Sequence, residues 1–502
     1  MTDQISSEQK DKESFSEFVF KRRANRRFLY IGVAALVGQF IVFKSLYPLA
    51  DFFGDSYHYI YAALHGMDFH IWPIGYPKFL YLIHQITHSD TALVGIQFLL
   101  LGGTALLFFF TLLYWYSLSS NTATLLFIFL FSNPLFIIAS NLIGADALFA
   151  ALTVLWFTQL LWILHRPRHW QIWTHAALIT MALTVRHNAM FYPLVSTVAF
   201  LFSGYTIRAK VAGIVIPLLL IGLFVVHTRS ESYKLTGIRQ FSMLGGWHLA
   251  NNALYMYPYI DVDTTELPKE TASLNRMVKA YFDTIPREMV ATPLKKVGGY
   301  FIISINSPLS RYSNLIEWNP RKEPQIMASV APLYYTYGTH LIKKHPLAYI
   351  RYYVLPNTLI YLVPPAEKLG GYDGSYDRID TLGFQWFDYE ARKKSMASAE
   401  LQKAVLVPLP FIFLLINLTF VGGFIAFALR RNKKKYPILW NALLISGCLY
   451  LTNMGFSIFA APMLMRYQIF FFIIFSGFSA VLIDTRIRLD EKSRSLKLNR
   501  GK

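Results

Sequence analysis

The chain is poor in cysteine and in charged residues. Cys448 is the only cysteine among 502 residues, so the sequence excludes an intrachain disulfide and a metal site built from a thiolate cluster. Only 15% of the residues are charged, whereas 54% are hydrophobic. That is more apolar surface than one ordinary soluble core can bury, and it favours a membrane protein.

Acidic residues are also scarce relative to basic ones. The chain has 29 Asp and Glu against 48 Lys and Arg, a net charge of +19. The basic residues cluster beside apolar runs and form no stripe interleaved with aromatic residues, so we expect no nucleic-acid partner. The first twenty residues lack an apolar core, and we interpret them as part of a cytoplasmic tail that no signal peptidase removes.

Long apolar runs recur along the chain and predict about ten transmembrane helices. The basic cluster at 21–27 precedes the first run, and other basic clusters follow later ones, so the positive-inside rule places both termini in the cytoplasm. The expected location is the bacterial inner (plasma) membrane. The expected spans lie near 28–49, 91–116, 122–140, 147–164, 174–187, 190–203, 211–227, 403–429, 437–459 and 467–484.

The predicted fold is an all-α polytopic membrane protein with a mixed, mostly helical extracytoplasmic domain. No internal repeat is visible. Within the outer part, 343–365 predicts an interfacial helix and 370–380 a turn-rich loop, because its acidic residues lack the calcium-loop spacing. The expected units are a tail (1–27), a transmembrane module (28–227) with its first outer loop at 50–90, an outer domain (228–402), further transmembrane helices (403–485) and a second tail (486–502).

The first outer loop begins with DFFGDSYHYIYAALHG, which places two carboxylates, Asp51 and Asp55, just beyond an apolar span. If this stretch were one helix, both would share a face with His58, although Gly54 makes that continuity doubtful. One interpretation is structural, because Asp55 suits the N-cap of the helix that follows. The other is functional, because a carboxylate at the membrane surface can act as a general base.

Several motifs in the same order resemble the GT-C superfamily of membrane glycosyltransferases, which includes protein mannosyltransferases and aminoarabinose transferases. The resemblance covers about the first 205 residues and the last span. It rests on GDSYHYIYAALHG and WPIGYPKFLYLI in the first outer loop, FSNPLFIIASNLIGADALFAALTVLW, ALTVRHNAMFYPLV, and APMLMRYQIFFF before the last span.

The resemblance implies an enzyme that transfers a sugar from a polyprenyl phosphate to an extracytoplasmic acceptor (a glycan, lipid or protein). Its expected partners are that lipid-linked sugar, the acceptor and membrane lipids. It implies inversion at the anomeric carbon. The catalytic base falls on Asp55, because the tyrosine-bearing helix follows it closely. Asp51 and Asp146 are possible second acidic residues, although Asp146 also suits a helix N-cap.

A polyprenyl phosphate leaving group develops negative charge, and fixed cations would stabilise it. Arg186, Arg466 and Lys78 lie at expected outer boundaries and are the candidates for binding this phosphate, whereas snorkelling is the structural alternative for each. Further candidates for substrate binding lie in the same motifs: Tyr57, His58, Tyr76, His187 and Tyr467.

The sequence contains one loose grouping of possible metal ligands. His65, Asp68 and His70 have a spacing that a divalent ion could use, but such loose groupings are common, so we expect no metal and no other cofactor. Two alternatives to an enzyme stay open. One is a lipid-linked glycan transporter or flippase, against which the lack of an inverted repeat counts. The other is a noncatalytic scaffold whose outer domain binds glycan or protein.

Overall fold

The computed structural model describes residues 13–285, 298–315, 319, 321–366, 379–389, 398–429, 435–460 and 462–500. Within these residues the chain is almost entirely helical and contains no β-strand; an isolated bridge joins Asp51 to Leu142. The all-α prediction is confirmed for this part of the chain. Nearly all of the expected turn-rich loop at 370–380 lies outside the described residues.

Eight helices in the described residues are long and apolar enough to cross a membrane, so a multi-pass membrane protein is confirmed at this level. The spanning segments are α3 (Arg23–Leu46), α6 (Asp90–Tyr116), α7 (Ser120–Phe131) with α8 (Pro134–Asn141), α9 (Asp146–His165), α12 (Ile207–Thr236), α22 (Ala399–Leu406) with α23 (Leu409–Leu429), α24 (Pro437–Phe459), and a 3₁₀ turn (Met465–Gln468) with α25 (Ile469–Arg500).

The difference from the expected ten spans falls on two short helices. α10 (Trp170–Val185) has 16 residues and α11 (Tyr192–Phe202) has 11. At 1.5 Å per residue these helices are roughly 24 and 16 Å long, which is less than the hydrocarbon layer of about 30 Å. Between them Arg186 is extended and a 3₁₀ turn covers His187–Phe191, so the chain reverses here.

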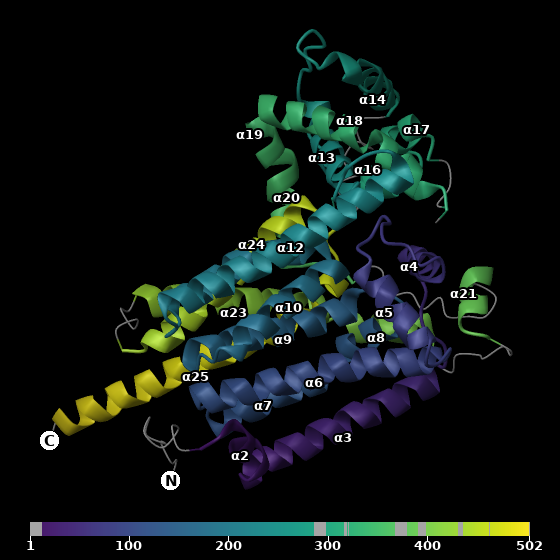
Figure 1. Cartoon of the computed structure of the whole chain (residues 1–502). Helices are drawn as coiled ribbons and strands as arrows, with labels where there is room; N and C mark the ends of the chain where they lie inside the picture. Colours follow the sequence, from purple (N-terminus) through teal and green to yellow (C-terminus); the bar gives the residue numbers. More distant parts are fainter. Residues whose placement is uncertain are drawn as a thin grey trace.

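Helices α9 and α25 form the centre of the bundle, whereas α3 and α12 lie at its periphery (Figure 1). α9 buries residues on every side, and the first half of α25 does the same. Helices that are hydrophobic all round pack in this way, because no face favours water. The N-terminal ends of these two central helices carry Asp146 and, one turn before α25, Arg466.

Shorter helices gather at the two ends of the bundle. α2 lies at one end and α4, α5 and the later helices lie at the other (Figure 1). They are α2 (Phe15–Phe20), α4 (Gly54–Leu64), α5 (Gly75–His84), α13 (Leu244–Leu254), α14 (Ala272–Thr284), α16 (Tyr300–Ile303), α17 (Pro308–Ser313), α18 (Glu323–Lys344), α19 (Pro346–Tyr349), a π-helical turn (Ile350–Val354), α20 (Leu355–Leu362) and α21 (Thr381–Trp386).

Close helix packing fixes the position of α18. A Cβ atom at Gly246 of α13 would lie 2.0 Å from the carbonyl oxygen of Ala331 on α18, so only glycine permits this approach. The indole of Trp247 donates a hydrogen bond to the carbonyl of Met327 at 3.1 Å. These contacts lie four and eight residues after Glu323, the first residue of α18, and they hold that residue beside His58 of α4.

Candidate functional site

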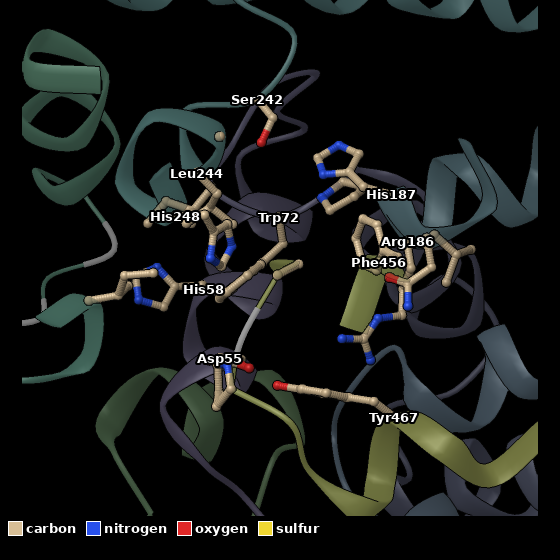
Figure 2. Close-up of a pocket in the computed structure, with 18 of the residues that line it drawn as sticks. Asp55, His58, Trp72, Arg186, His187, Ser242, Leu244, His248, Phe456 and Tyr467 are labelled. Atoms are coloured by element: carbon tan, nitrogen blue, oxygen red, sulfur yellow. The ribbon is translucent and has the colours of Figure 1, made fainter. Parts of the chain in front are cut away.

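A cavity of about 460 Å³ lies where α4, the 3₁₀ turn at His187–Phe191, α13 and the chain before α25 meet. Apolar side chains form most of its wall, and a smaller number of charged and polar groups reach into it. This combination is typical of ligand sites in proteins. Figure 2 shows Asp55 and Tyr467 at one end of the cavity and Ser242 at the other.

Asp55 reaches the cavity from the first turn of α4. The helix begins at Gly54, one residue earlier, so Asp55 does not cap it. The hydroxyl of Ser56 instead accepts a hydrogen bond from the backbone N–H of Phe53 at 3.1 Å and donates to the carbonyl of Ile143 at 2.7 Å. These bonds anchor the helix start, and its positive end favours the Asp55 carboxylate nearby.

Asp51 takes a different position from the one that a continuous helix would give. Because α4 begins only at Gly54, Asp51 lies outside the helix and does not share a face with His58. Its backbone N–H donates to the carbonyl of Asn141 at 2.9 Å, and its carbonyl accepts from Ile143 at 3.0 Å. Asp51 is buried beside α8 and is absent from the cavity wall.

Two arginines at the Asp55 end share one carboxylate. Asp146, the first residue of α9, accepts hydrogen bonds from Arg186 and, at 3.0 Å, from Nη1 of Arg466. The Asp146 side chain is 2% exposed. The carboxylate therefore bridges two guanidinium groups. It does not cap the helix, as the sequence also allowed, because Ala145 occupies the N-cap position.

Arg466 connects this bridge to Asp55. Its Nη2 lies 3.2 Å from a carboxylate oxygen of Asp55 and donates to the hydroxyl of Tyr467 at 2.8 Å. The guanidinium carbon is 4.2 Å from the ring centre of Phe53, and that of Arg186 is 4.2 Å from the ring centre of Tyr467. Such stacking on aromatic faces holds guanidinium planes in fixed orientations.

One donor of Arg466 is left over. Its Nε is buried and has no hydrogen-bond partner within the described residues. A buried donor of this kind costs free energy when it is unpaired, so such groups often mark a place where a ligand binds. Because Arg466 lines the cavity, an acceptor atom of a ligand could satisfy this N–H.

A second contact between titratable side chains crosses the cavity farther from the arginines. Nε2 of His58, on α4, lies 3.1 Å from a carboxylate oxygen of Glu323, and the two side chains are 7% and 1% exposed. Burial raises the pKa of Glu323, while the contact with His58 lowers it by less. The pair joins α4 to α18. The sequence around Glu323 contains no motif and its partner is remote in the chain, so local pattern gives no signal for this residue.

Ring nitrogens also surround this part of the cavity. Nε1 of Trp72 and Nδ1 of both His58 and His248 are buried and lack hydrogen-bond partners in the described protein. Burial lowers the pKa of His248 to about 4, and burial together with Arg186 and His248 lowers the pKa of His187 to about 4. The two imidazoles are therefore neutral near pH 7, and each can both donate and accept a hydrogen bond.

Three residues from the sequence-based set lie away from this cavity. Tyr76 is fully buried and its hydroxyl donates to Gln97 at 2.8 Å, so its role is in packing. Lys78 is half-exposed and pairs with Asp68 at 2.7 Å, because α5 turns its ammonium toward the loop. The hydroxyl of Tyr57 accepts a hydrogen bond from the backbone N–H of Asp380 at 3.1 Å. None of the three side chains lines this cavity.

Apart from Asp51 and Asp146, the remaining residues of that set line one cavity, together with Asp55. They come from α4, the turn after α10, and the turn before α25: His58, Arg186, His187, Arg466 and Tyr467. In the described residues no group of three or more His, Cys, Asp or Glu side chains is arranged to hold a metal ion. His65 and Asp68 instead contact Tyr61 and Lys78.

Comparisons with known proteins add no relative: no family model, no curated protein and no solved structure matches this chain.

Proposed function

We propose that the protein is an integral-membrane glycosyltransferase that moves a sugar from a polyprenyl phosphate to an acceptor on the extracytoplasmic side. The observation that carries the proposal is the meeting of Asp55, Arg186 and Arg466 at one end of a single cavity. A general base and two cations in reach of one another are the groups that this reaction requires.

In the proposed reaction the Asp55 carboxylate takes the proton of an acceptor hydroxyl. The hydroxyl oxygen attacks the anomeric carbon as the bond from that carbon to the phosphate oxygen breaks, so the configuration inverts. The electron pair of the broken bond stays on the polyprenyl phosphate. Arg186 and Arg466 stabilise the charge that develops there, and the low dielectric of a mostly apolar cavity strengthens their effect.

The contacts of Arg466 support this division of roles. It contacts Asp55 at 3.2 Å and still has a buried, unpaired Nε–H. A phosphate oxygen would take up that N–H and would compete with Asp55 for the guanidinium. Binding of the donor would thereby loosen the ion pair of the base in the same step that fixes the leaving group.

The other end of the cavity suits a sugar or an acceptor. Trp72 offers an aromatic face, and its ring nitrogen, like Nδ1 of His58 and Nδ1 of His248, has no described partner. Sugar hydroxyls both donate and accept hydrogen bonds, so they can satisfy imidazole nitrogens and an indole N–H together. Glu323 would orient His58 from above.

The orientation of the chain is part of the proposal. The basic clusters beside the apolar runs favour a plasma membrane with both termini in the cytoplasm, which puts α4 and α18 outside. A lipid-borne donor would then reach the arginines from the membrane, whereas the acceptor would arrive from the outer side.

The decisive experiment is replacement of the proposed base. A strain that lacks the protein should accumulate a lipid-linked sugar and lose a sugar from an envelope glycan, as read by mass spectrometry. Asp55→Asn should fail to restore transfer, because losing a general base costs about 100- to 10,000-fold in rate. Asp68→Asn makes the same change in the same loop outside the cavity and should restore it. Native transfer by Asp55→Asn would refute the assignment.

A further inference from the structure

A second cavity, of about 680 Å³, lies at the opposite end of the bundle. Its wall comes from α6, α9 and α10 together with the start of α2. Asp146 begins α9 and Arg166 follows its last residue, so this cavity opens roughly 30 Å from the Asp146 carboxylate. Figure 1 shows α2 and α4 at opposite ends of the long helices. The second cavity is therefore separate from the candidate active site.

The cavity has an apolar part and a basic rim. Leu107, Leu155 and Leu178 supply aliphatic wall on helices that run through the bundle. The rim is the turn between α9 and α10, where Arg166 and Arg168 flank a proline. Within the described residues neither guanidinium forms an ion pair with an acidic side chain. An apolar cavity with two arginines at its rim is complementary to a molecule that has a hydrocarbon chain and an anionic head group.

Two tryptophans lie at the same level as these arginines. Trp162 is in the last turn of α9, and Trp170 begins α10 with 56% of its surface exposed. Both line the cavity. Tryptophan is enriched where membrane head groups meet hydrocarbon, because its ring is apolar and its N–H is polar. The rim therefore has the composition of a membrane interface.

A buried polar group inside the cavity is an independent observation. Gln159 is 9% exposed and lines the cavity, and its amide nitrogen donates to the carbonyl of Gln171 at 3.3 Å. Its Oε1 is buried and has no partner in the described residues. Gln171 in turn accepts a hydrogen bond from the backbone N–H of Arg168 at 2.7 Å. The unpaired acceptor thus lies next to the basic rim, where it can receive a hydroxyl hydrogen.

We propose that this cavity is a specific binding site for one anionic phospholipid with a hydroxyl-bearing head group, the chemistry of phosphatidylglycerol. The phosphate lies between Arg166 and Arg168, a head-group hydroxyl donates to Gln159, and an acyl chain fills the apolar part. A free phosphate ion would leave that apolar wall unfilled. The site is independent of sugar transfer, because it faces the other membrane surface.

Native mass spectrometry of the purified full-length protein tests the proposal, with phosphatidylglycerol and phosphatidylcholine of equal chain length as probes. We expect retention of one phosphatidylglycerol in preference to phosphatidylcholine. The double variant Arg166→Ala/Arg168→Ala should lower that retention about tenfold, because each cation near a membrane surface adds appreciable affinity for anionic lipid. Arg208→Ala, an exposed position in the first turn of α12 outside the cavity, should leave it unchanged.

A second variant addresses the apolar part without changing charge. Ala177→Trp on α10 places a bulky ring in the cavity wall and should displace both lipids from a protein that keeps its melting temperature. Equal retention of the two lipids, or the same loss from Arg208→Ala as from the double variant, would overturn the proposal. So would displacement by inorganic phosphate alone. A several-fold gain in lipid on deletion of residues 1–12 would assign the cavity to that segment instead.

Discussion

The Asp146 carboxylate accepts a hydrogen bond from Arg466 at 3.0 Å across a separation of 320 residues. Both side chains are 2% exposed, so the pair is a buried link between the N-terminal ends of the two central helices. Asp146 also binds Arg186. One carboxylate therefore sets the positions of both cations that we propose for the donor phosphate, without itself lining the cavity.

Removal of that carboxylate should affect both cations together. Asp146→Asn leaves two guanidinium groups without their shared partner, and breaking a buried ion pair costs about 3–5 kcal/mol of unfolding free energy. We expect a lower melting temperature and a higher KM for the lipid donor, with a smaller change in KM for the acceptor. Asp484→Asn removes another buried carboxylate, which pairs with Arg488 near the far end of α25. It should lower the melting temperature and leave the donor KM unchanged; an equal rise in donor KM would contradict the prediction.

The planar fork of Arg466 should matter beyond its charge. Its Nη1 donates a hydrogen bond to Asp146 and its Nη2 donates one to Asp55. Its Nε has no partner in the described residues and is free to donate to a ligand. Lysine at this position keeps the charge but has a single ammonium, so Arg466→Lys should lower kcat about 100-fold or more, the cost of one lost electrostatic contact in a transition state. Steady-state transfer assays in lipid nanodiscs measure it. Lys78→Arg, outside the cavity, is the control, and a kcat within twofold of the native value for Arg466→Lys would disprove the role.

The sequence predicts the parts of this site that depend on local patterns, but it does not predict contacts between residues that are far apart in the chain. Asp55, Arg186 and Arg466 each stand at the boundary of an apolar run, and the resemblance of the motifs around them to the GT-C superfamily selected them as candidates. The bridging role of Asp146 and the contact between His58 and Glu323 depend on packing between remote helices, and no local pattern encodes them.

The differences between these expectations and the structure have physical causes of the same kind. Asp51, Tyr76 and Lys78 share the segment 50–90 with Asp55, but a bridge to Leu142, a hydrogen bond to Gln97 and an ion pair turn them elsewhere. The ten expected spans became eight candidates because apolar windows do not register the extended break at Arg186.

Glu323 should make the protein less stable as pH rises. Burial raises its folded-state pKa above the unfolded value, so the folded protein binds the proton more tightly and loses stability as pH rises from the ordinary glutamate range through the folded pKa. Glu323→Gln removes the charge and should flatten this part of the profile. Thermal unfolding in detergent between pH 4 and pH 8 measures it. Glu266→Gln, at a half-exposed pair with Lys344, should leave the profile as it is; a native profile for Glu323→Gln would show that the group is not destabilised when charged.

His248 should act in the opposite direction. Its pKa is lowered to about 4, so the folded protein binds fewer protons than the unfolded chain between about pH 4 and the ordinary histidine pKa of about 6.5. Its stability contribution is complete above that window and is lost as pH falls through it, by about 3 kcal/mol in all. His248→Asn should reduce the loss on acidification. As a control, His169→Asn changes an exposed histidine at the other end of the bundle and should not reduce the loss of stability on acidification. Equal acid sensitivity of the native protein and His248→Asn would contradict the assignment.

The contact of α13 with α18 predicts an asymmetry between adjacent glycines. Gly246→Ala forces a Cβ onto the Ala331 carbonyl and should lower the unfolding free energy by about 1–3 kcal/mol, the usual cost of overpacking. Gly245→Ala meets no atom within 4 Å and should be neutral or stabilising, because alanine favours the helix. Melting temperatures of the two variants decide this directly. Equal effects would show that the helices are not in contact at Gly246.

The wall of the first cavity includes Met190, Phe191 and Ile303, each 38% exposed. Met190 and Phe191 lie on the 3₁₀ turn after Arg186, whereas Ile303 is the last residue of α16, and the three side chains together form an apolar part of the cavity wall. A molecule that consists only of a sugar and a phosphate would bind the guanidinium groups but would leave this apolar surface in contact with water. An inhibitor of such a site therefore needs a hydrocarbon chain as well as an anionic group. Water-soluble sugar phosphates should compete poorly for the site, even when they mimic the reacting atoms.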